Sequence, residues 1–233
     1  MLEAKGLRAS YRDSLVLDGL NITVAPGQGV ALLGRNGAGK TTLLKSIMGG
    51  GPQVSGELRF MDQDLLAMPT HLRARAGLAL VPEDRRVFSH LTVDENLLLA
   101  RHAAGDRGSL TLGEIYRLFP VLADLRQRMG SQLSGGQQQI LAVARGLMPR
   151  PLCMLLDEPT EGVAPILVEQ MAEQVNSARH EHGTALLLTE QNLWFGRKCT
   201  EYVYVIDTGR IVFQGTWPEF DSRPDVVNRY LVV

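Results

Sequence analysis

The chain has 233 residues and a formal net charge of −1, with 24 Lys and Arg against 25 Asp and Glu. This balance, together with the interspersed charges, argues against a protein that is held to nucleic acid by phosphate neutralisation. No stretch approaches the roughly 18 consecutive apolar residues that a membrane span needs, and the first residues lack a signal pattern, so we expect a soluble chain in the cytoplasm.

The first 35 residues are predicted to form strands. Residues 20–24 alternate between apolar and polar side chains, which is typical of a half-buried strand. Residues 30–33 form a short apolar run that suits a central parallel strand. The pattern becomes helical from Lys40 to Met48 and ends at a run of glycines. Residues 56–62 alternate again and predict another strand.

The middle of the chain is predicted to be rich in helices. Thr92 and Glu95 have the spacing of a capping box that opens a helix. Residues 112–129 carry apolar side chains three and four positions apart, with arginines between them, and are predicted to be helical. These helices form an insert at about residues 90–150 in a mixed α/β core.

The last third of the chain returns to alternating strands and helices. Strands are predicted at 152–156, 184–189 and 202–206, with a long helix at 165–181. A hairpin turn at Asp207–Arg210 leads into a further strand, and Thr216–Glu219 caps a short helix near the C-terminus.

Residues Gly34–Thr41 match the phosphate loop G-x-x-x-x-G-K-S/T. Its glycines let the backbone approach a phosphate closely, and the N-terminus of the following helix points its N–H groups at the anion. Lys40 would reach the β- and γ-phosphates, and Thr41 would place a hydroxyl on Mg²⁺. A plain glycine-rich turn is the alternative, but the apolar run before the loop and the helix after it favour nucleotide binding.

Two acids, Asp157 and Glu158, follow an apolar run that is predicted to be a strand. An acid at the carboxyl end of a parallel strand faces the crevice in which ligands of α/β proteins bind. Asp157 would hold Mg²⁺, directly or through water, and Glu158 would orient or deprotonate the attacking water. An ordinary strand followed by a polar turn is the alternative.

A third motif, Leu133–Gln137, begins a helix with a serine and two glycines. Ser134 is a good N-cap, and Gly135 and Gly136 leave backbone N–H groups bare at the start of the helix. A capped glycine-rich helix start is common by itself. Beside the two preceding motifs, it indicates a second anion-binding site.

These three motifs, in this order and spacing, resemble the Walker A, signature and Walker B motifs of ABC transporter ATPase subunits. The resemblance runs essentially from residue 1 to 233 and implies a single ABC ATP-binding domain. The implied fold is an α/β P-loop NTPase with a RecA-like core, an antiparallel β subdomain and an α-helical subdomain at about 90–150.

The resemblance implies Mg²⁺-dependent ATP hydrolysis in a head-to-tail dimer, in which the signature residues contact ATP held by the opposite subunit. Tyr11 would stack on adenine, although a core strand position is its alternative. The implied ATP-binding residues are Tyr11, Gly34, Asn36, Gly37, Ala38, Gly39, Lys40, Thr41, Thr42, Ser134, Gly135, Gly136 and Gln137. The implied catalytic residues are Glu158, Lys40 and Gln191, and the implied metal ligands are Thr41, Asp157 and Glu83.

Three positions depart from the broader ABC pattern. Glu83 stands where most members have a glutamine, Gln191 where most have a switch histidine, and Ala164 where most have an aspartate. Gln191 can still donate a hydrogen bond to phosphate, but it cannot titrate. We expect Glu83 to face Mg²⁺ or a basic residue such as Arg85 or Arg86, with a solvated loop acid as the alternative.

The segments 81–88, 161–165 and 189–192 are similar to the smaller ATPase of branched-chain amino acid importers. ATPases of urea and amide importers are similar too, and lipid export or a mechanical or regulatory module outside transport stay as alternatives. The implied partners are a second copy or a paralogous ATPase, two membrane permeases that dock near residues 83–90, and indirectly a solute-binding protein. The chain would then lie at the cytoplasmic face of the inner membrane. Phe88 and Leu91 would be docking residues or core residues.

Overall fold

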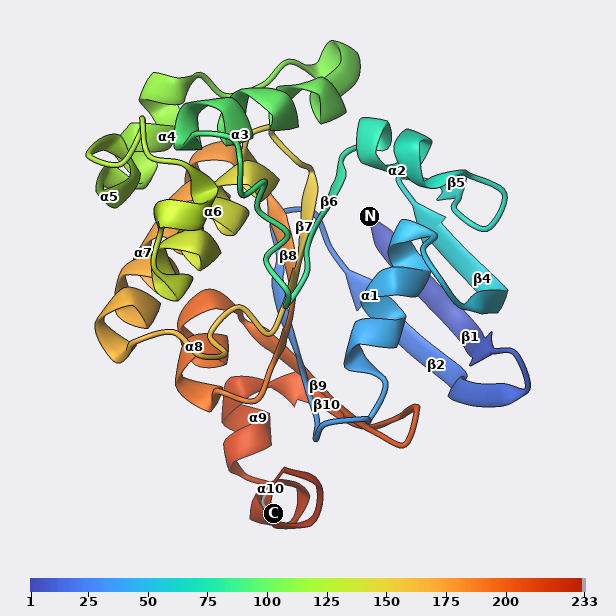
Figure 1. Ribbon diagram of the computed structural model, residues 1–233. Coiled ribbons are helices and arrows are strands. Elements are labelled where there is room, and N and C mark those ends of the chain that lie inside the picture. Colours follow the sequence, from blue (N-terminus) through green and yellow to red (C-terminus); the bar gives the residue numbers. More distant parts are fainter. Residues whose placement is uncertain (232–233) are drawn as a thin grey trace.

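The chain folds into two β-sheets with surrounding helices in the computed structural model, which describes residues 1–231 (Figure 1). The antiparallel sheet has the order β2-β1-β4-β5, and the larger, mostly parallel sheet has the order β10-β9-β3-β8-β7-β6. The strands are β1 (Leu2–Tyr11), β2 (Ser14–Val24), β3 (Gly29–Leu33), β4 (Gln53–Phe60), β5 (Gln63–Asp64), β6 (Leu78–Val81), β7 (Cys153–Asp157), β8 (Ala185–Glu190), β9 (Tyr202–Asp207) and β10 (Arg210–Thr216).

Helices occupy most of the connections between these strands. They are α1 (Lys40–Met48), α2 (Thr70–Ala76), α3 (Val93–Ala100), α4 (Leu112–Leu118), α5 (Pro120–Ala123), α6 (Gly135–Leu147), α7 (Pro165–His182), α8 (Leu193–Cys199), α9 (Trp217–Asp221) and α10 (Pro224–Tyr230), with 3-10 helices η1 (Arg101–Arg107) and η2 (Gly130–Gln132). Within residues 1–231, none of the helices combines the length and apolar character that a membrane crossing requires.

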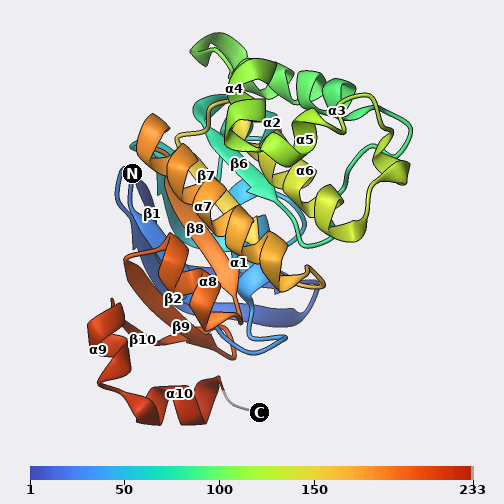
Figure 2. The same ribbon diagram turned by 90° about the vertical axis from the view of Figure 1, so that its left-hand side faces the viewer.

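Both faces of the larger sheet are covered. Helices α7 and α8 lie on one face (Figure 2), and α1 and the antiparallel sheet lie on the other (Figure 1). Successive side chains of β8 therefore enter different cores: Leu186 and Leu188 pack with α6 and α7, whereas Leu187 packs with α1 and β1. Burial on both faces explains why the central strands are continuous apolar runs.

The predicted helix over residues 112–129 is wrong in its second half. The structure has two short helices, α4 and α5, that are separated at Phe119, and turns follow after Ala123. Pro120 lacks an N–H group and disfavours helical geometry in the residue before it. Phe119 accordingly has φ −123° and ψ 73°. Helices α3 to α6, between β6 and β7 along the chain, occupy the upper left of Figure 1.

Local capping chemistry places several other element ends where the sequence predicted them. The helix Lys40–Met48 ends at Gly49, whose φ of 77° is left-handed and whose N–H donates back into the last turn. At the start of α3, the Glu95 N–H donates to the Thr92 hydroxyl, and the Glu95 carboxylate accepts the Thr92 N–H at 2.8 Å.

The predicted strands of the last third are β7, β8 and β9, each within one residue of its expected bounds.

Candidate active site

The carboxyl ends of β3, β8 and β7 meet at one edge of the larger sheet. These strands are parallel neighbours, with β8 between the other two. The phosphate loop follows β3, Glu158 follows β7, and Gln191 follows β8. Ligands of open α/β sheets bind at this kind of edge, so strand order brings three segments that are far apart in sequence to one place.

The phosphate loop has the backbone geometry of an anion cradle. Gly37 and Gly39 have positive φ values of 80° and 113°, which glycine adopts without strain. A Cβ on Gly34 would lie 2.5 Å from the carbonyl oxygen of Ile206. Helix α1 starts at Lys40, and no side chain among residues 1–231 caps it. Its first N–H groups are therefore available to phosphate.

Lys40 is buried at the centre of this loop. Its Nζ donates to the carbonyl oxygens of Gly34 at 2.7 Å and Arg35 at 3.1 Å, and it lies 2.9 Å from Oε1 of Glu158. The side chains of Lys40 and Glu158 are only 3% and 11% exposed. A buried ion pair of this kind is costly to break by removing one partner, so the two side chains hold each other in position.

Gln191 completes the surroundings of the Glu158 carboxylate. Its Nε2 donates to Oε2 of Glu158 at 2.9 Å and to Oδ1 of Asn36 at 2.7 Å. One carboxylate oxygen of Glu158 thus faces Lys40 and the other faces Gln191. Glu158 also has a left-handed φ of 42°, which is uncommon for a residue with a side chain and occurs often at functional sites.

Asp157 lies beside Glu158 and accepts two hydroxyl groups. Thr41 Oγ1 donates to its Oδ1 at 3.1 Å, and Thr189 Oγ1 donates to the same oxygen at 2.7 Å. Burial raises the pKa of the Asp157 carboxyl, and the two hydroxyl donors oppose that rise. Within residues 1–231, no Lys or Arg forms an ion pair with Asp157. The charge of Lys40 lowers the pKa of Asp157 as a smaller effect, and a carboxylate beside a hydroxyl matches the oxygen ligands that Mg²⁺ prefers.

Of the two expected neighbours of Glu83, Mg²⁺ or a basic residue, the described chain shows no basic residue paired with it. Glu83 lines a cavity of about 410 Å³ together with the phosphate loop, Glu158 and Glu161. Burial raises the pKa of the Glu83 carboxyl, and the negative charges of Glu161, Glu158 and Asp157 raise it further. Arg86 instead pairs with Asp84 at 2.9 Å, and no described Lys or Arg pairs with Glu83. Glu83 is nevertheless exposed, so it lies near other acids while water can solvate it, which fits the alternative of a solvated loop acid.

Several residues at this site were not predicted from the sequence. Glu161 and Val16 line the cavity with Asn36, Thr41 and Thr42, and Thr189 binds Asp157. Glu161 belongs to the same acidic segment as Glu158 and could have been found from it. Val16 and Thr189 carry no such signal, because only strand pairing brings them to the loop. Ala38 is buried within the loop against the core that surrounds α1.

The signature segment is a capped helix start, as predicted. Ser134 Oγ accepts the Gln137 N–H at 3.3 Å, and Oε1 of Gln137 accepts the Ser134 N–H at 2.9 Å. Gly135 and Gly136 are the first residues of α6. Among the residues that line the phosphate-loop cavity, none belongs to 134–137. Within one chain, the structure therefore does not bring the signature segment to the phosphate loop.

Tyr11 also lies away from the phosphate loop. It is 38% exposed at the end of β1 and lines a separate cavity with Lys45 and Arg85. A Cβ on Gly51 would lie 3.3 Å from the Tyr11 ring, so the ring rests on this glycine. Tyr11 as an adenine contact stays a prediction of the resemblance, whereas Val16 lines the phosphate-loop cavity itself.

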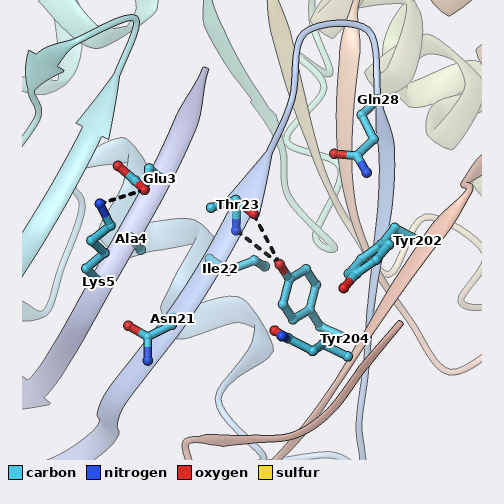
Figure 3. A pocket seen from close by; sticks show the side chains of 10 residues that line it. Glu3, Ala4, Lys5, Asn21, Ile22, Thr23, Gln28, Tyr202 and Tyr204 are labelled. Atoms are coloured by element: carbon cyan, nitrogen blue, oxygen red, sulfur yellow. Dashed lines mark hydrogen bonds and ion pairs between the residues drawn. The ribbon is translucent and has the colours of Figure 1, made fainter. Parts of the chain in front are cut away.

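Another hollow, between β1, β2 and β9, contains none of the predicted site residues (Figure 3). The Tyr204 hydroxyl accepts the Thr23 N–H at 3.3 Å and bonds its hydroxyl, and Lys5 pairs with Glu3 at 2.8 Å. These polar groups satisfy one another, and the Tyr204 contact joins the two sheets. We therefore assign this hollow a structural role.

Comparisons with known proteins agree with this geometry. The sequence model described as ABC transporter matches residues 17–161. The high-affinity branched-chain amino acid transport ATP-binding protein BraG of Pseudomonas aeruginosa is 37% identical over 232 residues, covering 99% of each chain. The lipopolysaccharide export system ATP-binding protein LptB of Escherichia coli is 32% identical, covering 99% of this chain and 96% of LptB.

Solved structures show the same fold. The ADP conformation of an ATP-binding cassette of an ABC transporter has a TM-score of 0.83 and 25% identity, covering 98% of this chain and 97% of that one. A dimeric cassette in a post-hydrolysis state, bound to ADP and Pi, has a TM-score of 0.81 and 21% identity, covering 93% and 98%. The predicted α/β P-loop fold of ABC type is confirmed. Residues 1–231 contain the cradle, the paired acids and the capped signature helix, and the chain belongs to the family of ABC transporter ATP-binding proteins.

Proposed function

We propose that this chain hydrolyses ATP with Mg²⁺ to power an importer for branched-chain amino acids. The observation that carries the proposal is the position of Glu158 between Lys40 and Gln191, next to the Asp157 carboxylate and the Thr41 hydroxyl. The similarity to BraG supports the choice of cargo. Residues 1–233 would act as one ABC ATP-binding domain, with the helices at about 90–150 as an inserted subdomain.

The chemistry divides among a few side chains. The loop N–H groups and Lys40 would bind the β- and γ-phosphates, with Lys40 exchanging one of its present acceptors for phosphate. Mg²⁺, held by Thr41, Asp157 and Glu83, would supply positive charge to the phosphates. Glu158 would orient the attacking water and accept its proton, a role worth about 10²- to 10⁴-fold in rate. Gln191 would keep the Glu158 carboxylate in place.

A complete site would need a second ATPase subunit. The start of α6 lies outside this chain's own phosphate-loop cavity, because none of the residues 134–137 lines it. Ser134, Gly135, Gly136 and Gln137 would therefore contact ATP that is bound by the opposite subunit. That subunit would be a second copy in isolation and a paralogous ATPase in the cell.

Membrane permeases would dock at a basic groove, which we define as the cavity of about 690 Å³ lined by Lys45, Arg85, Arg86 and Arg145 among apolar residues. Phe88 is 45% exposed and stacks at 4.6 Å under Arg145, which lines the groove. Leu91 is half-buried. Binding to permeases would place the chain at the cytoplasmic face of the inner membrane.

Charge reversal in the basic groove should separate ATP hydrolysis from transport. Arg86→Glu is expected to reduce coupled uptake by about tenfold or more, because a reversed charge at an interface opposes association. Basal ATP turnover should stay within about twofold, since the Arg86 side chain is 70% exposed and pairs only with Asp84. Uptake and turnover in proteoliposomes measure the two effects. Arg223→Glu is the matched control, and equal losses in both variants would contradict docking at this groove.

The glutamine at position 191 predicts how ATP turnover depends on pH. Because its amide cannot titrate, wild-type turnover should lack the step that a switch histidine would add between about pH 5.5 and 8. Gln191→His should introduce that step, with a change in kcat as the imidazole gains a proton. A pH–rate profile at saturating ATP compares the two proteins. Identical profiles would count against a contact between residue 191 and the γ-phosphate.

Lipid export is the second candidate, supported by the 32% identity to LptB over 99% of this chain. Uptake of urea or short amides would use the same ATPase chemistry. Purifying the native complex from membranes through a tag on this chain, and identifying its permeases and bound solute, tests the proposal. Importer permeases with a binding protein that holds leucine, isoleucine or valine are expected. Export components, or a binding protein that holds urea, would overturn the proposed cargo.

A further inference from the structure

Glu190 is a buried carboxylate that the proposed mechanism has not used. It is the last residue of β8, directly before Gln191, and is only 2% exposed. No Lys or Arg of the described chain forms an ion pair with it. Buried acids are rare unless they are paired or fully hydrogen-bonded, so the contacts of Glu190 need a physical explanation.

The Glu190 carboxylate joins two loops of the candidate active site. Its Oε1 accepts the N–H of Thr160 at 3.1 Å, in the loop that follows Glu158. Its Oε2 accepts the N–H groups of Gln191 at 3.0 Å and Asn192 at 2.9 Å. Burial raises the pKa of this carboxyl, and these N–H donors oppose the rise. Each oxygen therefore serves a different loop.

From these contacts we propose that Glu190 is a positioning residue for ATP hydrolysis. It ties the loop of Thr160 to the loop of Gln191 and so maintains the hydrogen bond from Gln191 to Glu158. The inference rests on the proposed ATPase function, because it assigns a role at the same site.

The contact between Glu190 and the Thr160 N–H matters because it lies close to the unusual backbone conformation of Glu158. The left-handed φ of Glu158 is costly for a residue with a side chain and persists only where the surrounding contacts enforce it. The Glu158 N–H donates to the carbonyl oxygen of Thr189 at 3.0 Å, which fixes the backbone on one side. The link from Thr160 to Glu190 fixes it two residues later.

Two substitutions cut the link in different ways. A carboxylate only accepts hydrogen bonds, whereas an amide has one accepting oxygen. Glu190→Gln therefore leaves either the Thr160 N–H or the N–H groups of the Gln191 loop facing an NH₂ group. Glu190→Asp is one methylene shorter, so it can bond N–H groups of its own loop but cannot reach Thr160.

The test measures ATP turnover, ATP affinity and thermal stability in these variants, alone and combined with Gln191→Ala. We expect kcat to fall about tenfold in both Glu190 variants, with the Kd for ATP within about threefold. Because Glu190 acts through Gln191 as well as through the Thr160 loop, Glu190→Gln should lower kcat by a smaller factor in the Gln191→Ala background than in the wild type. Glu201→Gln is the control for lost stability outside the site, because Glu201 accepts the Gly29 N–H at 2.6 Å and pairs with the buried Arg179 at 3.1 Å.

Three results would overturn the inference: unchanged kcat in Glu190→Gln, additive losses in the double variant, or a fall in kcat that Glu201→Gln reproduces at equal loss of thermal stability. If Glu190→Gln does not fold, Glu190→Asp decides between the same outcomes. Turnover by the wild-type protein reports on the ATPase proposal separately. A wild type that hydrolyses ATP beside an unaffected Glu190→Gln would remove only the positioning role.

Discussion

Glu158→Gln is expected to lower ATP turnover by about 10²- to 10⁴-fold, the range that a general base contributes. Glutamine has nearly the same shape, and its amide oxygen can still accept from Lys40 or Gln191. It cannot accept the proton of the attacking water. The phosphate loop and Lys40 are unchanged, so ATP should bind with a Kd within about threefold of the wild-type value.

The Glu158→Gln variant should accumulate as an ATP-bound dimer, because two subunits that close around ATP no longer hydrolyse it. Single-turnover kinetics with size-exclusion chromatography in ATP measures both effects. Glu169→Gln, an exposed acid on α7, is the matched control and should behave as wild type. Near-normal turnover in Glu158→Gln would remove Glu158 from the base role.

Lys40→Ala has the second large expected effect, on ATP affinity. Hydrogen bonds to charged groups contribute about 1.5–3 kcal/mol, which corresponds to a loss of roughly 10- to 100-fold in affinity. The substitution also leaves the Glu158 carboxylate, 11% exposed, without its cation, and an uncompensated buried charge is destabilising. We therefore expect a lower melting temperature as well.

Calorimetric titration with ATP and thermal melting separate these two consequences of Lys40→Ala. Lys198→Ala, on α8 and away from the phosphate-loop cavity, should change neither. Lys40→Arg should also bind ATP poorly, because the larger guanidinium must fit a position that is only 4% exposed. Wild-type affinity in Lys40→Ala would contradict the proposed phosphate contact.

Features that depend on neighbours in sequence could be predicted. The phosphate loop, the end of α1 at Gly49 and the capping box at Thr92 each rest on a few adjacent residues. The break between α4 and α5 at Phe119 is also local, because Pro120 follows it directly in the sequence. The regular spacing of apolar residues nevertheless predicted one continuous helix there. Periodicity reports which side chains share a face and does not report where a helix must stop.

Features that depend on strand order could not be predicted from the residues. Gln191 binds Asn36 across 155 positions of sequence, and only the order β3-β8-β7 brings them together. The acidic surroundings of Glu83 and the two-loop contact of Glu190 arise in the same way. The roles of Glu158 and Gln191 came from motif and resemblance, whereas their mutual hydrogen bond came from the structure.

ATP turnover by the purified chain at saturating ATP, with Mg²⁺, after chelation and after Mg²⁺ is restored, tests the central claim most directly. Asp157 and Thr41 bring a carboxylate and a hydroxyl oxygen together, and no described Lys or Arg forms an ion pair with Asp157, so the chain should hydrolyse ATP only when Mg²⁺ is present. We expect turnover that disappears on chelation and returns with Mg²⁺. Turnover that is unaffected by chelation, or absent with Mg²⁺ even in the complex with permeases, would contradict the account.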